Sequence, residues 1–216
     1  MKKTPIDMTT YARKAHFDYF RSLAYPYVGV TAEMDITDFR RATKQHGCNF
    51  FHSFLWCVSQ AANRIPQLRQ RQAGDGIVEY DFCPTSHTVA REDETYVYCD
   101  LNANCPYTEF LPYAEKTQRE AVAGGDIDRT PGEEEPLLFI SCMTWLSHTA
   151  LTLPTPIPAD SNPRITWGKF FERDGKTLIP VSLQVNHALA DGLHMSRFYK
   201  YLEEKLAEVV DLLDKN

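Results

Sequence analysis

The segment from Ile179 to Gly192 constrains the fold most, because it places a histidine at the end of a half-buried strand. Apolar residues alternate with polar residues or proline from Ile179 to Asn186, which is the period of a strand buried on one side. His187 follows directly, and Asp191-Gly192 begins four residues later. Apolar residues then recur at helical spacing: Phe198, Leu202, Leu206, Val209 and Leu213. A rigid strand therefore holds His187, and an imidazole, whose unperturbed pKa is near neutral, can act as a general base.

A histidine followed by Asp-Gly is a weak signal by itself, since histidines near a core more often make structural hydrogen bonds. Residues 183–194, however, resemble the active-site signature of the chloramphenicol acetyltransferases, which usually reads His-His-x-x-x-Asp-Gly. Asn186 stands in place of the first histidine. The resemblance assigns the chemistry to the second one, His187.

Five further segments resemble this family, in family order and over nearly the whole chain. They are an opening helix at Tyr11–Arg21, a helix entry at Met34–Thr37, a third helix at Phe50–Asn63, and strands at Ile140–Trp145 and Ile165–Phe170. The family resemblance implies an α/β fold, a two-layer sandwich in which helices back a mixed β-sheet. It also implies a homotrimer.

Length and charge agree with a globular protein. The 216 residues are 43% hydrophobic, enough for one sizeable core, so we expect residues 1–216 to form a single domain. The family resemblance implies that this is a CoA-dependent acetyltransferase domain. The net charge of −6 gives no basic field, which excludes nucleic acid and anionic membranes as expected partners. No apolar run approaches the roughly 18 residues of a membrane span, and no apolar stretch follows Met1-Lys2-Lys3. We therefore expect a cytoplasmic protein.

The cysteines predict neither a disulfide framework nor a metal site. All six are irregularly spaced, and none forms a Cys-x-x-Cys pair. No pair of cysteines or histidines has ligand spacing on one face of an element. Metal is therefore not expected.

Caps, prolines and apolar periodicity predict the elements. Helices are expected from Thr9 or Thr10 to Arg21, from Thr37 to Gly47, from Phe51 to Arg64, from Thr108 to Ala123, and beyond Gly192. Strands are expected at Tyr25–Met34, Gly76–Phe82, His87–Arg91, Tyr96–Leu101 and Leu137–Trp145, followed by a hairpin of Arg164–Glu172 and Lys176–Asn186 in which Gly175 accepts positive φ. Asp126–Pro136 and Leu153–Pro163 are expected loops.

The resemblance implies acetyl transfer from acetyl-CoA to a hydroxyl of a small acceptor in a direct ternary complex. His187 would be the base, with its own backbone carbonyl accepting a hydrogen bond from Nδ1. Ser141 would donate to the oxyanion of the tetrahedral intermediate, and Thr166 would hold a water nearby. Without the resemblance, Ser141 would be interpreted as a buried serine bonded to nearby backbone, and a strand threonine needs no special role.

Asp191 has two interpretations. A carboxylate near a histidine can orient the imidazole, as in hydrolase triads. In the resembled family the matching aspartate instead pairs with an arginine of the first helix, here Arg13. We favour this structural support of the site, in which removal of either partner would leave the other charge uncompensated.

The resemblance also assigns substrate contacts. Trp145 would wall the CoA channel, and Lys169 would meet a phosphate, although either could equally be a core or surface residue. Resistance enzymes carry a lysine and a tyrosine near the adenosine phosphate where this chain has Cys48–Phe51, which predicts weaker CoA binding.

The acceptor pocket is expected to contain Phe20, Val28 and Tyr96. Phe20 lacks the hydroxyl of the family's tyrosine, and Val28 is smaller than its usual phenylalanine. Such a pocket could take chloramphenicol or prefer a similar hydroxylated compound. In the family trimer the histidine of one subunit faces a pocket of the next, to which Phe20 and Val28 would belong.

Two alternatives stay open. Catalytic domains of dihydrolipoyl acyltransferases share the fold and carry Asp-His-x-x-x-Asp-Gly, but this chain has no lipoyl domain or flexible Ala/Pro linker. The chain could also be a catalytically silent CoA-binding or structural trimer. The presence of His187, Ser141 and Asp191 argues against this second alternative.

Overall fold

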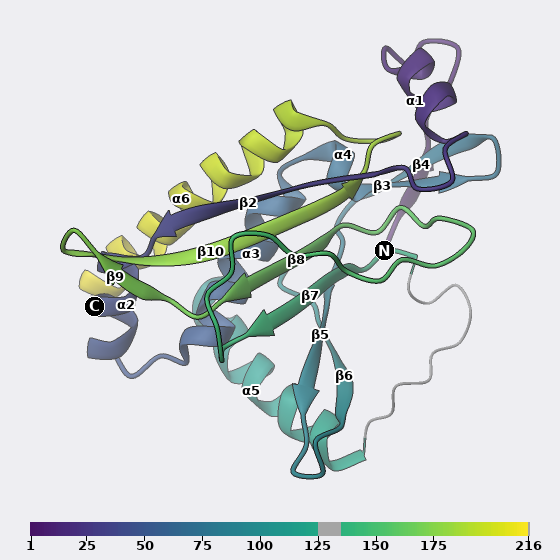
Figure 1. Cartoon of the computed structure of the whole chain (residues 1–216). Helices are drawn as coiled ribbons and strands as arrows, with labels where there is room; N and C mark the ends of the chain where they lie inside the picture. Colours follow the sequence, from purple (N-terminus) through teal and green to yellow (C-terminus); the bar gives the residue numbers. More distant parts are fainter. Residues whose placement is uncertain (125–134, 216) are drawn as a thin grey trace.

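The fold is a mixed β-sheet with helices on one face, seen in a computed structural model that describes residues 1–124 and 135–215 (Figure 1). The strands are β1 Lys3–Pro5, β2 Tyr27–Asp35, β3 Gln70–Ala73, β4 Gly76–Tyr80, β5 Thr85–Ala90, β6 Tyr96–Leu101, β7 Leu138–Met143, β8 Arg164–Gly168, β9 Phe171–Arg173 and β10 Lys176–Asn186. The helices are α1 Lys14–Phe20, α2 Thr37–Gln45, α3 Phe50–Asn63, α4 Pro66–Arg69, α5 Tyr107–Gly124 and α6 Gly192–Asp214. This arrangement is the predicted α/β sandwich.

The main sheet has the strand order β2-β10-β8-β7-β5-β6, and β9 pairs with β10 beside it. Strands β5, β7 and β8 are parallel to one another, whereas β10 runs antiparallel to β2, β8 and β9. Helices α2, α3, α5 and α6 lie behind the sheet, and the connection from β7 to β8 crosses in front of the other face (Figure 1). We call this second face the open face.

The side chains of strand β10 alternate between the helix-covered core and the open face. Ile179, Val181, Leu183 and Val185 belong to the core under the helices. Because side chains alternate along a strand, Ser182, Gln184 and the other even-numbered residues point to the open face. The alternation predicted from the sequence therefore separates the packing residues from those that can meet a ligand.

Local hydrogen bonds explain why some observed helices and strands differ from the expected ones. Helix α1 begins at Lys14 because Thr9 and Thr10 bond to Asp7 instead of capping a helix. Thr37 does not cap α2, because its backbone N–H and hydroxyl both donate to Asp35 Oδ1. The hairpin strand expected at 164–172 is divided into β8 and β9. The tight turn before β10 has Gly175 at φ 76°, which confirms the positive φ.

A second, three-stranded sheet, ordered β1-β4-β3, lies beside α1 and was not predicted from the sequence. Most of the loop expected at 126–136 lies outside the described residues. The six cysteines, all within the described ranges, are free. Over residues 1–124 and 135–215 no helix is long and apolar enough to cross a membrane.

Two buried histidines share one amide beneath the sheet. His52 Nε2 and His87 Nε2 each lie 3.0 Å from Gln118 Oε1. Both Nδ1 atoms are buried, and neither has a partner within the described ranges. Burial lowers the pKa of His87 to about 4 and lowers the pKa of His52 as well.

This cluster predicts acid sensitivity. Because the folded-state pKa of His87 is below the unfolded value, protonation favours the unfolded chain. Its stabilisation is complete above the unfolded pKa and falls, by up to about 3 kcal/mol, as the pH drops toward about 4. Denaturant titrations between pH 7.5 and 5, at constant protein concentration, should show this slope, and His87→Gln should reduce it. The exposed His46→Gln is the control, and an unchanged slope in His87→Gln would contradict the assignment.

Candidate active site

His187 follows the last residue of β10 and is held on two sides. Its backbone N–H donates to the Pro26 carbonyl at 2.7 Å, and its Nδ1 lies 3.1 Å from the Ala190 carbonyl oxygen. A carbonyl only accepts, so Nδ1 carries the hydrogen and Nε2 keeps a free lone pair. The expected partner was the carbonyl of His187 itself. The tight turn after β10 brings the Ala190 carbonyl to Nδ1 instead.

Asn186 builds the turn that positions His187. Its carbonyl accepts hydrogen bonds from the N–H groups of Leu189 and Ala190. Its side-chain oxygen accepts from Ala188 N–H at 3.0 Å, and its amide donates to the Asp160 carbonyl at 2.8 Å. The asparagine that departs from the usual signature therefore fixes the backbone under the imidazole, a role that its motif position alone did not indicate.

Asp191 caps α6 and forms an ion pair with Arg13, the residue before α1, rather than with His187. Arg13 Nη1 lies 2.5 Å from Asp191 Oδ2, while Oδ1 accepts from Leu193 N–H and lies 2.8 Å from His194 Nδ1. Burial alone would raise the pKa of Asp191, but the hydrogen bond and charge of Arg13 lower it to about 2. Across the described ranges no hydrogen bond joins Asp191 to His187, so the geometry is that of a support.

Asp191→Asn should therefore reduce stability together with activity. Arg13 Nε and Nη2 are buried without a partner among the described residues, so loss of the carboxylate leaves a poorly compensated guanidinium. We expect the free energy of unfolding to fall by about 1 to 3 kcal/mol, measured by denaturant titration alongside turnover. The control is Asp18→Asn, which breaks an exposed pair with Lys14. A variant that loses turnover but keeps full stability would assign Asp191 to the chemistry.

Ser141 and Thr166 are cross-strand neighbours on the open face. They lie opposite each other in the pairing of β7 with β8, and both line a hollow of about 260 Å³ together with Tyr96. Thr166 Oγ1 is fully buried and has no hydrogen-bond partner in the described part of the chain. An unsatisfied buried hydroxyl of this kind is suited to hold a water or a polar ligand. We call this cavity the Ser141 hollow.

The Ser141 hollow lies far from His187 of the same chain. Thr166 is opposite Ser182 in β10, five residues before His187. At about 3.3 Å per residue the base is about 17 Å farther along the strand. One chain alone therefore does not bring the base and the hydroxyls together.

The three residues expected in the acceptor pocket are separated. The ring of Phe20 stacks on the His187 imidazole, with centroids 3.9 Å apart and an interplanar angle of 18°. Val28 lies opposite Val185 and packs against the core, and it also borders a hollow of about 390 Å³ between β2, β10 and residues 149–153. Only Tyr96 shares the Ser141 hollow. Phe20 thus lies beside the His187 of its own chain.

The residues expected at CoA lie at the opposite end of the open face from His187. Trp145 is 78% exposed, and exposed Lys169 donates its backbone N–H to the Leu146 carbonyl at 2.9 Å. Phe170 follows and lines a hollow of about 270 Å³ with Phe50, Arg40, Thr43, Lys44 and Cys48. Arg40 and Lys44 of α2 therefore border residues 48–51, the region in which this chain lacks the lysine expected from the family.

In the described part of the chain, no three His, Cys, Asp or Glu residues gather as metal ligands would.

Comparison with solved structures defines the class of the protein. A chloramphenicol acetyltransferase structure superposes with a TM-score of 0.83 at 26% identity, covering 95% of this chain and 100% of that one. A probable dihydrolipoamide acetyltransferase from Listeria monocytogenes superposes with a TM-score of 0.66 at 18% identity, which shows a shared fold alone. The molecule has the CoA-dependent acyltransferase fold.

Sequence comparison identifies the family within this fold class. The family model described as chloramphenicol acetyltransferase matches residues 1–203. The chain is 28% identical over 213 residues to a chloramphenicol acetyltransferase of Proteus mirabilis, covering 92% of each chain. It is 29% identical over 208 residues to that of Streptomyces acrimycini, covering 94% of each. The chain belongs to the chloramphenicol acetyltransferase family and is an acetyltransferase of that kind.

Proposed function

We propose that the protein transfers the acetyl group of acetyl-CoA to a hydroxyl of a small acceptor, chloramphenicol or a similar compound. The hydrogen bond from His187 Nδ1 to the Ala190 carbonyl carries this proposal, because it leaves Nε2 as the basic atom. The stacked Phe20 ring restricts rotation of the imidazole further. A fixed, neutral imidazole is what abstraction of a hydroxyl proton requires.

In the proposed reaction, His187 Nε2 accepts the proton of the acceptor hydroxyl while its oxygen attacks the thioester carbonyl carbon. The tetrahedral intermediate carries negative charge on the former carbonyl oxygen, and the Ser141 hydroxyl donates to it. The Thr166 hydroxyl holds a water beside the same centre. Collapse breaks the carbon–sulfur bond, and the imidazolium returns its proton to the CoA thiolate.

We infer that the site lies between subunits of a homotrimer. The separation of about 17 Å along β10 supports this, since His187 of one chain needs a Ser141 hollow from another. Phe20 would enter the site with the histidine, and Tyr96 with the hollow. Residues 1–216 would act as one domain, in the cytoplasm where acetyl-CoA is available.

CoA would run along Trp145 and Lys169. The exposed indole offers an apolar wall for the pantetheine arm, and Lys169 a charge for phosphate. Arg40 and Lys44 add positive charge beside Phe50 and Phe170, where the adenosine end would lie. These two cations would offset the loss of the family's lysine, so the weaker CoA binding expected from residues 48–51 need not follow.

A thiol-release assay tests this function. The protein is mixed with acetyl-CoA and a panel of hydroxylated acceptors that includes chloramphenicol, and free CoA thiol is followed with a chromogenic disulfide. Release that depends on an acceptor supports the proposal. Release without any acceptor indicates a thioesterase, and no release with any acceptor indicates a silent CoA-binding protein.

A further inference from the structure

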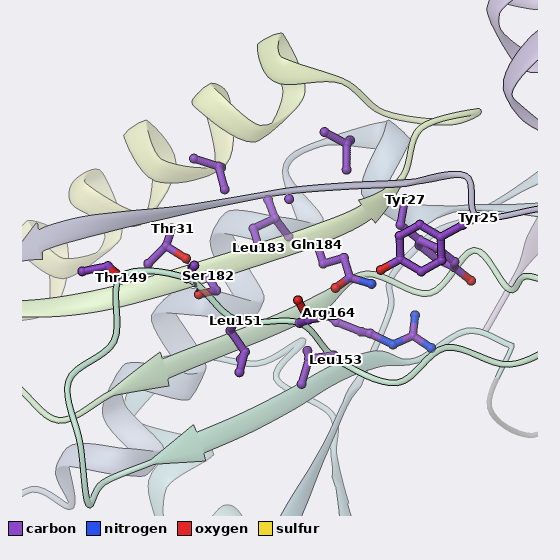
Figure 2. A pocket seen from close by; sticks show the side chains of 15 residues that line it. Tyr25, Tyr27, Thr31, Thr149, Leu151, Leu153, Arg164, Ser182, Leu183 and Gln184 are labelled. Carbon is purple, nitrogen blue, oxygen red and sulfur yellow. Dashed lines mark hydrogen bonds between the residues drawn. The ribbon is translucent and has the colours of Figure 1, made fainter. Parts of the chain in front are cut away.

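A second hollow adjoins the Ser141 hollow on the open face. It measures about 390 Å³ and lies between β2, β10 and the connection at residues 149–153. Arg164 and Leu153 line both hollows, so the two are direct neighbours. We call it the Gln184 hollow. Figure 2 shows Gln184 extending from β10 over the sheet toward Arg164, with Tyr27 beside it.

The Gln184 amide is the unsatisfied group of this hollow. Its side chain belongs to a residue only 8% exposed, and Nε2 is buried with no hydrogen-bond partner in the part of the chain that the structure describes. A buried amide donor without a partner is destabilising, because the loss of its hydrogen bond to water is not compensated. A ligand that offers an oxygen acceptor here would recover that cost.

Arg164, directly opposite Gln184 in the β8–β10 pairing, sets the charge that the hollow accepts. Its Nη1 and Nη2 bind Asp160 Oδ1 and Oδ2 at 2.9 and 2.7 Å, and Nη1 also donates to the Asn162 carbonyl. Tyr27 donates to Asp160 Oδ1 at 2.9 Å. The guanidinium is thus neutralised by its own carboxylate, so the hollow favours a neutral polar group over an anion.

The sheet fixes the distance between the two hollows. Gln184 lies opposite Arg164, Arg164 opposite Phe139, and Ser141 is two residues beyond Phe139 in β7. Two interstrand steps and two residues along a strand separate the Cα atoms of Gln184 and Ser141 by about 12 Å. An acceptor whose hydroxyl reacts at Ser141 therefore has to be elongated to reach Gln184.

We propose, resting on the function proposed above, that Gln184 is a specificity residue for the acceptor. Its Nε2 donates to a neutral oxygen at the far end of the molecule, such as that of a nitro, carbonyl or ether group. The substrate class is an elongated alcohol with an apolar middle, which passes over Leu153 and Arg164, and a neutral hydrogen-bond acceptor at the end away from the reacting hydroxyl. The paired charges of Arg164 and Asp160 beside the amide disfavour an anion.

The test uses two acceptors that differ at one end. These are chloramphenicol and its analogue without the nitro group, with dissociation constants measured by calorimetry and turnover measured by thiol release. In Gln184→Leu the Kd for chloramphenicol should rise about tenfold, the worth of one buried hydrogen bond, while the Kd for the analogue and the KM for acetyl-CoA stay unchanged. Gln184→Glu keeps the side-chain length but removes the donors, so it should lose the same preference. Gln45→Leu, at an exposed position of α2, is the control.

Three results would overturn the inference: equal shifts for both acceptors, no shift for either, or no binding of chloramphenicol to the unaltered protein. Thermal melting of each variant separates these from misfolding, and Gln184→Glu provides the answer if Gln184→Leu does not fold. Absence of thiol release from the unaltered protein with every acceptor would instead contradict the proposed function. The two failures are therefore distinguishable.

Discussion

His187→Ala should lower kcat by about 10³ or more while the KM for acetyl-CoA changes little. The imidazole takes up a proton only as the acceptor oxygen attacks, so its contribution belongs to the transition state rather than to substrate binding. The half-buried ring packs on Phe20 and is held through Ala190, so its removal should affect folding modestly. Steady-state kinetics with saturating acetyl-CoA and the best acceptor of the panel measure the loss.

The control for this variant is His16→Ala, an exposed histidine on α1. It should retain full turnover and the same melting temperature. Wild-type turnover in His187→Ala would falsify the assignment of the base. A loss of acetyl-CoA affinity with unchanged kcat would make His187 a binding residue instead.

Ser141→Ala should lower kcat by about 10², because one donor to the oxyanion of the intermediate is removed. Its hydroxyl makes no hydrogen bond within residues 1–124 and 135–215, so the melting temperature should not change. Ser182→Ala is the matched control, since Ser182 belongs to the same row across β7, β8 and β10. Its hydroxyl is already bonded to Thr31 and His148, and kcat should fall less than tenfold. Unfolding of Ser141→Ala with retained specific activity would give Ser141 a structural role.

The sequence predicted the parts of the fold that carry a strong period. Strand β10 matches its expected bounds, and α6 begins at Gly192 as expected, because alternation and an apolar stripe continue over many residues there. Strands β1 and β3 are only three and four residues long and mostly polar, so no period marks them. Tertiary pairing with β4 makes them strands.

The sequence proposed residues for the site, but it could not predict the distances between them. Motif matching proposed His187 and Ser141, yet nothing in a linear pattern indicates that β10 carries His187 about 17 Å beyond Ser182. The Ala190 carbonyl could not be anticipated either, because backbone groups have no sequence signature. The Gln184 amide and its neighbour Arg164 were missed, although a charged residue in an apolar strand four residues after Asp160 was a usable signal.

Mixed trimers of His187→Ala and Ser141→Ala test the central claim, that a histidine of one subunit works with a serine of the next. Co-expression with two different affinity tags and two successive purifications would isolate trimers that contain both variants. In a cyclic trimer of either composition, one interface joins a sound His187 to a sound Ser141. Mixed trimers should therefore regain about a third of wild-type activity, far above either parent. Activity no higher than that of the parents, or a protein that is monomeric by light scattering, would contradict the shared site.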